Sequence, residues 1–454
     1  MKKVLLTTAC LMLLGHLQVS AEPAAAAVQS TVTDEERSGL KFKAGSGKLA
    51  PELLLPAEDM RWWRDAKLGI FIHWGLYAIP AKGEWLMHNE KIDPKEYAKL
   101  ADRFKPRHFD PDGWAMLAKD AGAQYMVMTA RHHDGFAMFD SPSSYQRFDT
   151  MRSAARADFI AGYVAAARKQ GMKVGLYYSP MDWRFPGYFD PKGLPANAAL
   201  MKKQGYGQVS ELMGNYGKID ILWYDGGWLA HRGSDADAAW FWRPEKLNAE
   251  VRKRQPKIVI NPRSGWQGDF DTEEGDRPIS GPVRPKPWEK TFTIGPAWGY
   301  IASDKAMAPE AVIRLIVDAV VRNGNVLVNM SPDADGTIPE RQVNTLQAVG
   351  AWMRANGESI QNTRPGPFQP VDGVYGSTVR GKNVYLHVQS WRGDRLKLPP
   401  LAQKIVSATT LSGTPVRFGQ SADGIVLGDD GASHDRLDMV IRLTADAPVA
   451  PIMP

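Results

Sequence analysis

The sequence predicts an α/β protein, a TIM-like (β/α) barrel followed by a C-terminal antiparallel β-sandwich. From about Trp62 to Asn356, short apolar runs alternate with helix-length amphipathic segments, most of which close on a glycine or a basic residue. Beyond residue 363 the runs are short and alternating, and no helical segment separates them. Strands that alternate with helices are typical of parallel β/α units, whereas strands alone are typical of a sandwich.

The first part contains seven recognisable strand runs. We expect strands within 68–75, 124–135, 173–180, 220–227, 257–264, 292–299 and 325–332. We expect helices within 114–123, 159–171, 208–217, 244–255, 309–324 and 340–360. Such a series favours a barrel with one degenerate strand, and a doubly wound open sheet is the alternative because periodicity does not distinguish a closed sheet from an open one.

Four segments follow from these patterns. Lys2 and Lys3 precede an apolar stretch that ends in small residues at Ala21, which predicts a signal peptide over 1–21. We expect residues 22–56 to form an N-terminal leader segment, 57–362 the (β/α) barrel and 363–454 the β-sandwich. We therefore expect a periplasmic or secreted protein without membrane insertion.

Composition excludes several classes of function. Cys10 is the only cysteine and lies in the predicted signal peptide, so disulfides and thiolate chemistry are not expected. The net charge of +6 is spread among 56 basic and 50 acidic residues, which does not make a nucleic-acid footprint. In a chain that we expect to be exported, 15 tryptophans favour a sugar ligand, although most tryptophans are expected in the core.

Polar and aromatic residues follow most of the predicted strands. They are His73-Trp74, Glu84-Trp85, His132-His133-Asp134, Tyr177-Tyr178, Asp225, Arg263, Glu273-Glu274 and Trp298. In a barrel the carboxyl ends of the strands meet at one face, where active sites form. Each residue alone has a structural explanation as a turn, loop or core residue, but their common position favours a site.

Two carboxylates among tryptophan, histidine and tyrosine fit glycoside hydrolysis. Asp225, fixed at a strand end, is the better nucleophile, and the acid is expected from a loop over 271–274, where burial or the nucleophile's charge raises its pKa. A metal site is the weaker alternative, because His132 and His133 as neighbours on an extended chain point to opposite faces. No HxH or HExxH spacing occurs.

The order of motifs from Trp62 to Ile360 resembles glycoside hydrolase family 29, the retaining α-L-fucosidases. The motifs are FIHWG (71–75), GEW (83–85), ARHHDGF (130–136), GLYYSPMDW (175–183), ILWYDGG (221–227), DFDTEE (269–274), PWE (287–289), WGY (298–300) and NVLVNMSPDADGTIP (325–339). The resemblance implies a TIM-like barrel followed by a β-sandwich, with no cofactor and no metal.

The resemblance also implies roles for the site residues. The nucleophile is Asp225, and the acid/base is Glu274, with Glu273 one residue away in the register. Residues implied to bind fucose are His73, Glu84, Trp85, His132, His133, Tyr177, Arg263 and Trp298. Trp298 corresponds to the aromatic platform for the C6 methyl group of fucose.

The leading hypothesis is an exported retaining α-L-fucosidase that acts on a fucosylated oligosaccharide or glycoconjugate. A non-catalytic fucose-binding protein is the alternative, although it is expected to have lost Asp225 or both glutamates, and all three are present. A metal-dependent hydrolase is a weaker alternative. The sequence leaves open the linkage and aglycone, the balance between hydrolysis and transfucosylation, and the oligomeric state; an oligomer is compatible with it.

Overall fold

The computed structural model describes residues 50–232, 235–303, 305–391, 395–428 and 439–453. The predicted signal peptide and most of the predicted leader segment lie outside the described residues. Among the helices of the described part, none is both long enough and apolar enough to cross a membrane.

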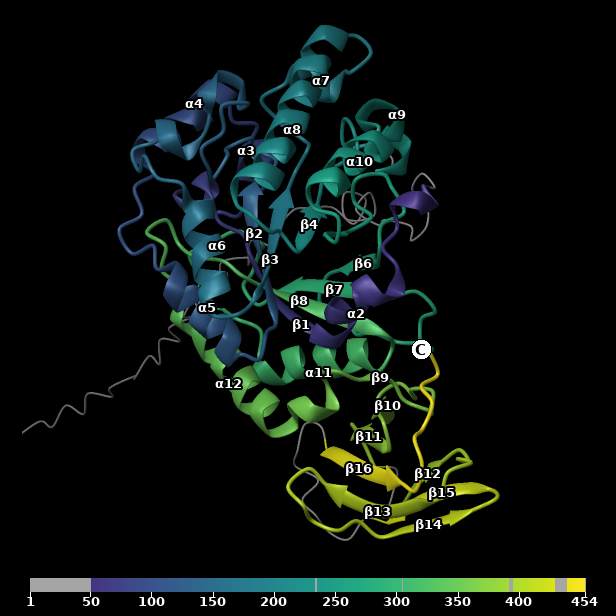
Figure 1. Cartoon of the computed structure of the whole chain (residues 1–454). Coiled ribbons are helices and arrows are strands. Elements are labelled where there is room, and N and C mark those ends of the chain that lie inside the picture. The colour runs from purple at the N-terminus through teal and green to yellow at the C-terminus, as the bar shows by residue number, and fades with distance from the viewer. Residues whose placement is uncertain (1–49, 233–234, 304, 392–394, 429–438, 454) are drawn as a thin grey trace, which may run out of the picture.

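Eight parallel strands form the central sheet, in the order β5-β4-β3-β2-β1-β8-β7-β6 (Figure 1). The strands are β1 (Leu68–Ile72), β2 (Tyr125–Arg131), β3 (Lys173–Tyr178), β4 (Ile221–Tyr224), β5 (Val259–Ile260), β6 (Asp271–Glu274), β7 (Trp288–Thr293) and β8 (Gly324–Met330). β5 and β6 are the two edges of the ladder, and the barrel closes between them through the amide of Asp269, two residues before β6, which donates to the carbonyl of Ile260 in β5 at 2.9 Å.

Near-continuous apolar sequence explains why the central strands sit deepest. Every residue of β1, β2, β4 and β8 is buried, as expected for parallel strands covered on both faces. β1 pairs with β2 through Ile70 and Met126 and with β8 through Ile70 and Val328. The first and the last strand of the central sheet in chain order therefore pair with each other, as in a barrel.

Helices connect and cover these strands. The longer ones are α2 (Ala57–Ala66), α5 (Pro111–Asp120), α6 (Phe159–Lys169), α8 (Pro195–Asn215), α10 (Pro244–Arg254), α11 (Pro309–Val320) and α12 (Glu340–Asn356). Shorter ones are η1 (Pro51–Leu53), η2 (Leu76–Ala78), α3 (Leu86–Asn89), α4 (Pro94–Ala98), η3 (Lys99–Arg103), η4 (Tyr145–Arg147), η5 (Thr150–Arg152), α7 (Pro186–Phe189), η6 (Ala236–Ala238), α9 (Ala239–Trp242) and η7 (Gly357–Ser359). Local sequence determines where several of these helices begin. For example, the side chain of Asp158 accepts a hydrogen bond from the amide of Ala161 and so caps the N-terminus of α6.

Two expectations for the sheet were wrong. Residues 271–274 were expected in a loop but form β6, which pairs in parallel with β7 and is the strand missing from the seven predicted runs. The run at 292–299 was placed too late, because β7 already begins at Trp288 and ends at Thr293. Both strands carry charged residues whose partners are distant in sequence, so neither shows the apolar pattern of a buried strand.

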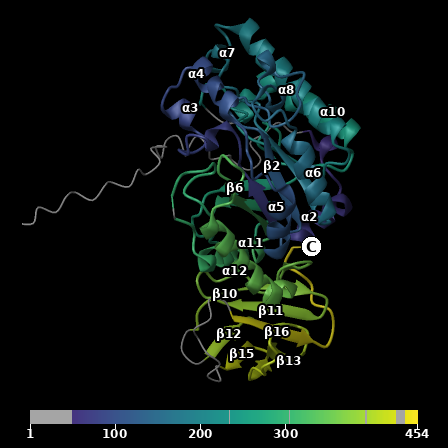
Figure 2. The same cartoon turned by 90° about the vertical axis from the view of Figure 1, so that its left-hand side faces the viewer.

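Two antiparallel sheets follow α12. One has the order β13-β16-β11-β10-β9 and the other β12-β15-β14. Their strands are β9 (Arg364–Pro365), β10 (Tyr375–Arg380), β11 (Asn383–Val388), β12 (Arg395–Leu398), β13 (Ile405–Thr410), β14 (Phe418–Ser421), β15 (Gly424–Gly428) and β16 (Met439–Ala445). Leu386 of the first sheet and Leu427 of the second belong to one apolar core, as in a sandwich. The sandwich lies beside α11 and α12 in both side views (Figures 1 and 2), so the predicted fold class is confirmed.

Candidate active site

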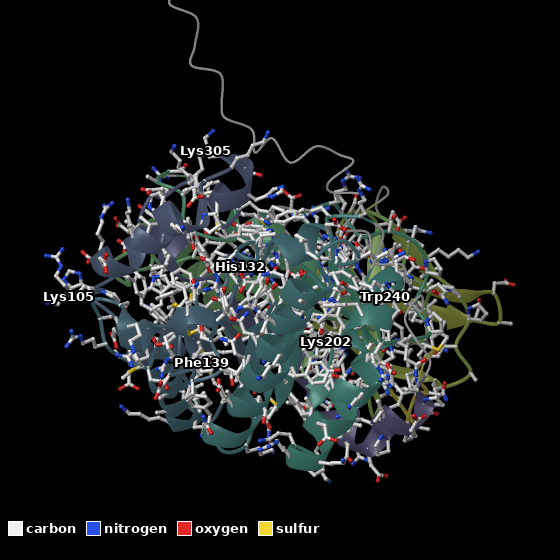
Figure 3. All side chains as sticks on the ribbon, turned by 90° about the horizontal axis from the view of Figure 1, so that it is seen from above. Lys105, His132, Phe139, Lys202, Trp240 and Lys305 are labelled. Carbon is white, nitrogen blue, oxygen red and sulfur yellow. The ribbon has the colours of Figure 1, made fainter. Side chains whose placement is uncertain are left out.

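One pocket gathers side chains from the carboxyl ends of the barrel strands. It is lined by Phe71, His73, Glu84, Trp85, His132, His133, Tyr177, Trp223, Asp225, Glu274, Thr291 and Trp298. Every predicted site residue except Arg263 is in this set, and Arg263 lies directly behind it, in contact with two of its carboxylates. In the view from above, His132 lies near the middle of the molecule and Lys105 at its edge (Figure 3).

Asp225 is the residue directly after β4, and hydrogen bonds hold its carboxylate in place. Its Oδ2 accepts a hydrogen bond of 2.9 Å from the hydroxyl of Tyr177, and its Oδ1 accepts one of 2.8 Å from the amide of Gly226. Nε2 of His133 lies 3.7 Å from Oδ2. The glycine that follows has a φ of 69°, a conformation that glycine adopts without strain, and this turn aims the carboxylate into the pocket.

Arg263 joins the two candidate catalytic carboxylates. Its Nη2 donates to Oδ1 of Asp225 at 2.5 Å, and its Nη1 donates to Oε2 of Glu274 at 3.2 Å. A third carboxylate, that of Asp235, lies 3.7 Å from Nε. Burial disfavours the charge of this guanidinium, but the three carboxylates raise its pKa above the ordinary value. One fixed cation therefore sets the relative position of Asp225 and Glu274.

Glu273 and Glu274 point to opposite faces of β6. Glu274 faces the pocket, whereas Glu273 forms ion pairs with Lys290, at 2.7 Å, and with Arg284. Burial raises the pKa of Glu274; the cation of Arg263 opposes this rise and the charge of Asp225 adds to it. Burial also acts on Glu273, but its hydrogen bonds to Lys290 and Arg284 lower its pKa. Of these two neighbours, only Glu274 thus combines access to the pocket with a raised pKa.

Three histidines form a neutral, hydrogen-bonding side of the pocket. Burial lowers the pKa of His73 to about 4 and the pKa values of His132 and His133 well below the ordinary value. Nδ1 of His73 lies 2.8 Å from Oδ1 of Asn329, and Nδ1 of His133 lies 2.6 Å from the hydroxyl of Ser179. These partners orient the rings and leave the second ring nitrogen for a ligand.

The expectation that His132 and His133 face opposite sides was wrong. Both line the pocket, and their ring centroids are 3.9 Å apart. The strand β2 ends at Arg131, after a register shift against β3, and the amide of Gly135 closes a turn on the carbonyl of His132. Strand alternation therefore no longer applies at these two positions.

The remaining predicted residues, Glu84, Trp85 and Trp298, complete the walls of the pocket. Glu84 accepts a hydrogen bond of 2.7 Å from the amide of Gly299, and burial, aided by the charges of Glu274 and Asp225, raises its pKa to about 7. The ring of Trp298 lies 5.1 Å from that of His73, and the ring of Trp85 lies 5.3 Å from that of His133.

Several neighbours in the predicted motifs point away from the pocket. Trp74 is fully buried among Phe109 and Trp114, the hydroxyl of Tyr178 accepts from Arg131, and Asp134 accepts from Tyr97. Sequence reasoning also missed pocket residues, namely Phe71, Trp223 and Thr291. They lie within β1, β4 and β7. Strand alternation places Phe71 on the face of His73 and Trp223 on the face of Asp225, but core residues show the same pattern, and Thr291 precedes the predicted run at 292–299.

No group of three or more His, Cys, Asp or Glu side chains in the described ranges is arranged to hold a metal ion.

The family model for alpha-L-fucosidase matches residues 53–358. This chain belongs to the α-L-fucosidase family. A tissue alpha-L-fucosidase of Bos taurus is 30% identical to it over an alignment of 393 residues, which covers 78% of this chain and 81% of the relative. A tissue alpha-L-fucosidase of Homo sapiens is 30% identical over an alignment of 344 residues, which covers 68% of this chain and 72% of the relative.

Solved structures of α-L-fucosidases share the fold. Isoenzyme 1 from Paenibacillus thiaminolyticus superposes with a TM-score of 0.75 at 32% identity, covering 86% of this chain and 99% of that one. A GH29 enzyme from Bacteroides thetaiotaomicron, described as a trapped covalent intermediate in complex with 2-fluoro-fucosyl fluoride, has a TM-score of 0.79 at 27% identity and covers 90% of this chain and 100% of that one. The family predicted from the motifs is confirmed, and with it the enzyme class, a glycoside hydrolase of the α-L-fucosidase type.

Proposed function

We propose that this chain is an exported, retaining α-L-fucosidase that hydrolyses terminal α-L-fucosides by double displacement. Asp225 is the nucleophile and Glu274 the acid/base. The observation that carries the proposal is the pair of carboxylates held on one buried guanidinium, Arg263, in a pocket walled by aromatic rings. Retaining glycosidases use two carboxylates in this way, one attacking and one protonating.

The charges in the pocket fit both halves of this reaction. Asp225 attacks the anomeric carbon while Glu274 protonates the departing glycosidic oxygen, which requires a Glu274 that holds its proton; burial and the charge of Asp225 favour that state. Formation of the ester neutralises Asp225, so the pKa of Glu274 falls and its carboxylate can accept a proton from water. The covalent intermediate described for the Bacteroides thetaiotaomicron relative supports the same sequence of steps.

The two sides of the pocket match the two sides of a deoxysugar. Glu84 and the three histidines offer hydrogen-bonding groups for hydroxyls, whereas Phe71, Trp223 and Trp298 offer apolar ring surface. In fucose a methyl group replaces the hydroxymethyl group of galactose, so an apolar wall favours fucose. Terminal fucose in an oligosaccharide or glycoconjugate is the proposed substrate. Export is supported only by the signal-peptide pattern that ends at Ala21.

Chemical rescue tests the two catalytic assignments. Fucose release from an aryl α-L-fucoside is measured for the wild type, Asp225→Gly and Glu274→Ala, with and without azide. We expect both variants to lose activity, Asp225→Gly to form the inverted β-fucosyl azide and Glu274→Ala the retained α-azide. Glu273→Ala is the matched control, because its side chain faces away from the pocket. If Glu273→Ala alone behaved as the acid mutant, the acid assignment would be wrong.

The same substrate separates the alternatives. A metal-dependent hydrolase loses activity in EDTA, whereas the proposed mechanism is insensitive to the chelator. A fucose-binding protein without catalysis would bind fucose and release none from any fucoside, and that result would overturn the proposed function.

A further inference from the structure

Asp235 is a buried acid beside the catalytic pocket, outside the motifs that predicted the site. It directly precedes η6 in the segment that follows β4, its side chain is 2% exposed, and it is not part of the pocket lining. An aspartate in this position usually caps the helix, but the side chain of Asp235 makes no capping hydrogen bond. Its carboxyl group is therefore directed toward other parts of the chain.

The carboxyl group of Asp235 holds the turn that follows the candidate nucleophile. It accepts hydrogen bonds from the backbone amides of Gly227 and Trp228, which come shortly after Asp225. A Cβ atom at position 227 would lie 2.5 Å from Oδ1 of Asp235 and 3.0 Å from the carbonyl oxygen of Arg263. A side chain does not fit between these two residues, which explains the second glycine after Asp225.

The same carboxyl group packs against the side chain of Arg263. Its Oδ2 lies 3.7 Å from Nε of Arg263, the nitrogen that contacts neither candidate catalytic carboxylate. The guanidinium carbon lies 5.6 Å from the ring centre of Trp223 and 5.9 Å from that of Trp228. Asp235 and the two rings therefore limit the movement of the guanidinium on the sides that the catalytic carboxylates leave open.

The buried position of this acid is unfavourable for the fold. Burial raises the pKa of Asp235 to about 8; the cation of Arg263 opposes the rise and the charge of Asp225 adds to it. Near pH 7 the acid form prevails, and it leaves the charge of Arg263 to the two catalytic carboxylates. Oδ1 of Asp235 has no hydrogen-bond partner among the described residues, which costs stability. An acid kept at such a cost, without a capping role, points to a part in the reaction.

We propose that Asp235 is a positioning residue for the nucleophile. It reaches Asp225 from two sides, through the amides of the following turn and through Arg263, whose Nη2 donates to Oδ1 of Asp225 at 2.5 Å. Asp235 itself does not line the pocket, so it acts on the reaction only through these contacts. The inference rests on the proposed function, because it requires Asp225 to attack the anomeric carbon.

Three variants separate the hold on the turn and on Arg263 from the charge of the acid. Asp235→Ala removes both contacts. Asp235→Asn keeps the size and an oxygen that accepts from the two amides, and it stays neutral, like the acid form. Asp237→Ala is the matched control, because Asp237 is an exposed acid in the helix that Asp235 precedes.

Two measurements are made on the wild type and on each variant. kcat and KM are determined for two aryl α-L-fucosides, one with an acidic phenol that leaves without protonation and one with a weakly acidic phenol that needs the acid. 2-Fluoro-fucosyl fluoride, the compound in complex with the Bacteroides thetaiotaomicron relative, then labels the nucleophile. Labelling gives the number of competent sites per chain and a rate constant that depends on the attack of Asp225.

We expect Asp235→Ala to lower kcat/KM roughly ten- to a hundredfold on both fucosides, because a misplaced nucleophile slows attack whatever the leaving group. The loss should lie in kcat rather than in KM. The rate constant of labelling should fall with it, and each chain should still be labelled once. Asp235→Asn and Asp237→Ala should keep activity close to that of the wild type.

Four results would overturn the inference while the wild type stays active. One is an unchanged kcat/KM in Asp235→Ala, and another is a loss confined to the weakly acidic leaving group, which would place the effect on Glu274. A third is a fall in labelled sites with an unchanged rate constant per site, which would make the role purely structural. The fourth is an Asp235→Asn as inactive as Asp235→Ala, which would show that the charge matters rather than the hold. A wild type that cleaves no fucoside and takes up no label would overturn the proposed function itself.

Discussion

At the scale of single residues, the site depends on Arg263. Its side chain is 3% exposed, and its two terminal nitrogens contact different carboxylates, so its position fixes Asp225 and Glu274 relative to each other. It also opposes the rise in the pKa of Glu274 that burial produces. The acid/base therefore stays within a range of pKa in which it can give up its proton and take it back.

Replacing this cation tests that balance. In Arg263→Met we expect kcat/KM on an aryl fucoside to fall roughly a hundredfold or more, because a charge-assisted contact to each carboxylate is lost. The basic limb of the pH profile of kcat/KM should move to higher pH, since the charge that lowers the pKa of Glu274 is gone. Arg284→Met, which removes the partner of Glu273 outside the pocket, should leave that limb in place. A basic limb unmoved in Arg263→Met would contradict the assigned acid.

The strand-end residues could be predicted from the sequence, whereas the pocket's inner wall could not. Asp225 follows an apolar run and precedes two glycines, and this local contrast is visible in the sequence. Phe71 and Trp223 look like any buried strand residues, because facing a pocket and facing the core leave the same pattern. The choice between Glu273 and Glu274 depends on Lys290 and Arg284, whose proximity arises only from the fold.

At the scale of elements, β7 carries an acid into the barrel core. Glu289 is 1% exposed, and its two carboxylate oxygens accept hydrogen bonds from the hydroxyl of Tyr125, at 2.6 Å, and from Nε1 of Trp223, at 3.0 Å. Trp223 in turn lines the pocket. Burial raises the pKa of Glu289 to about 7, although these hydrogen bonds oppose the rise.

This acid should make stability depend on pH. Between about 4.5 and about 7 the folded chain keeps a proton on Glu289 that the unfolded chain releases, so its contribution is present at low pH and lost as pH rises through 7. The free energy of unfolding of the wild type relative to Glu289→Gln should therefore fall by about 1.4 kcal/mol per pH unit across that window.

Urea unfolding at pH 4.5, 5.5, 6.5 and 7.5 measures this difference for Glu289→Gln. Glu250→Gln, at an exposed ion pair with Lys253, is the control and should give a difference that varies little with pH. A difference between wild type and Glu289→Gln that stays constant with pH would show that the buried acid is not the titrating group.

The same strand explains which elements the sequence could reveal. β1 to β5 lie within predicted runs and β8 begins one residue before its run, because burial on both faces requires continuous apolar sequence. β6 and the start of β7 carry acidic side chains, and each is paired with a residue far away in the chain, as in Glu273 with Lys290 and Glu289 with Tyr125. Apolar periodicity in the sequence does not reveal such pairs.

At the scale of the whole molecule, the sandwich contacts the barrel but contributes no residue to the lining of the pocket. The residues that line the pocket all fall between Phe71 and Trp298, which places them before the sandwich. Polar contacts join the two parts: Gln389 donates to Asp318 of α11 at 2.8 Å, and Thr378 donates to the carbonyl of Ser359 at 2.6 Å. These contacts predict a role in stability rather than in binding of fucose.

Arg322 of the barrel makes one more contact across this interface, to Asp372, and provides the test. Its side chain, 1% exposed, contacts Asp318 at 3.2 Å and Asp372 at 2.7 Å and donates to the carbonyl of Gly281 at 2.9 Å. Arg322→Met leaves the buried carboxylate of Asp318 without its cation, so we expect the free energy of unfolding to fall by about 3 kcal/mol. Arg442→Met removes an ion pair with Glu358 whose partners are 35% and 41% exposed, and should cost less than about 1 kcal/mol. Both variants should keep wild-type kcat/KM on an aryl fucoside at 25 °C, and a loss of activity without a loss of stability in Arg322→Met would assign the sandwich interface a part in catalysis.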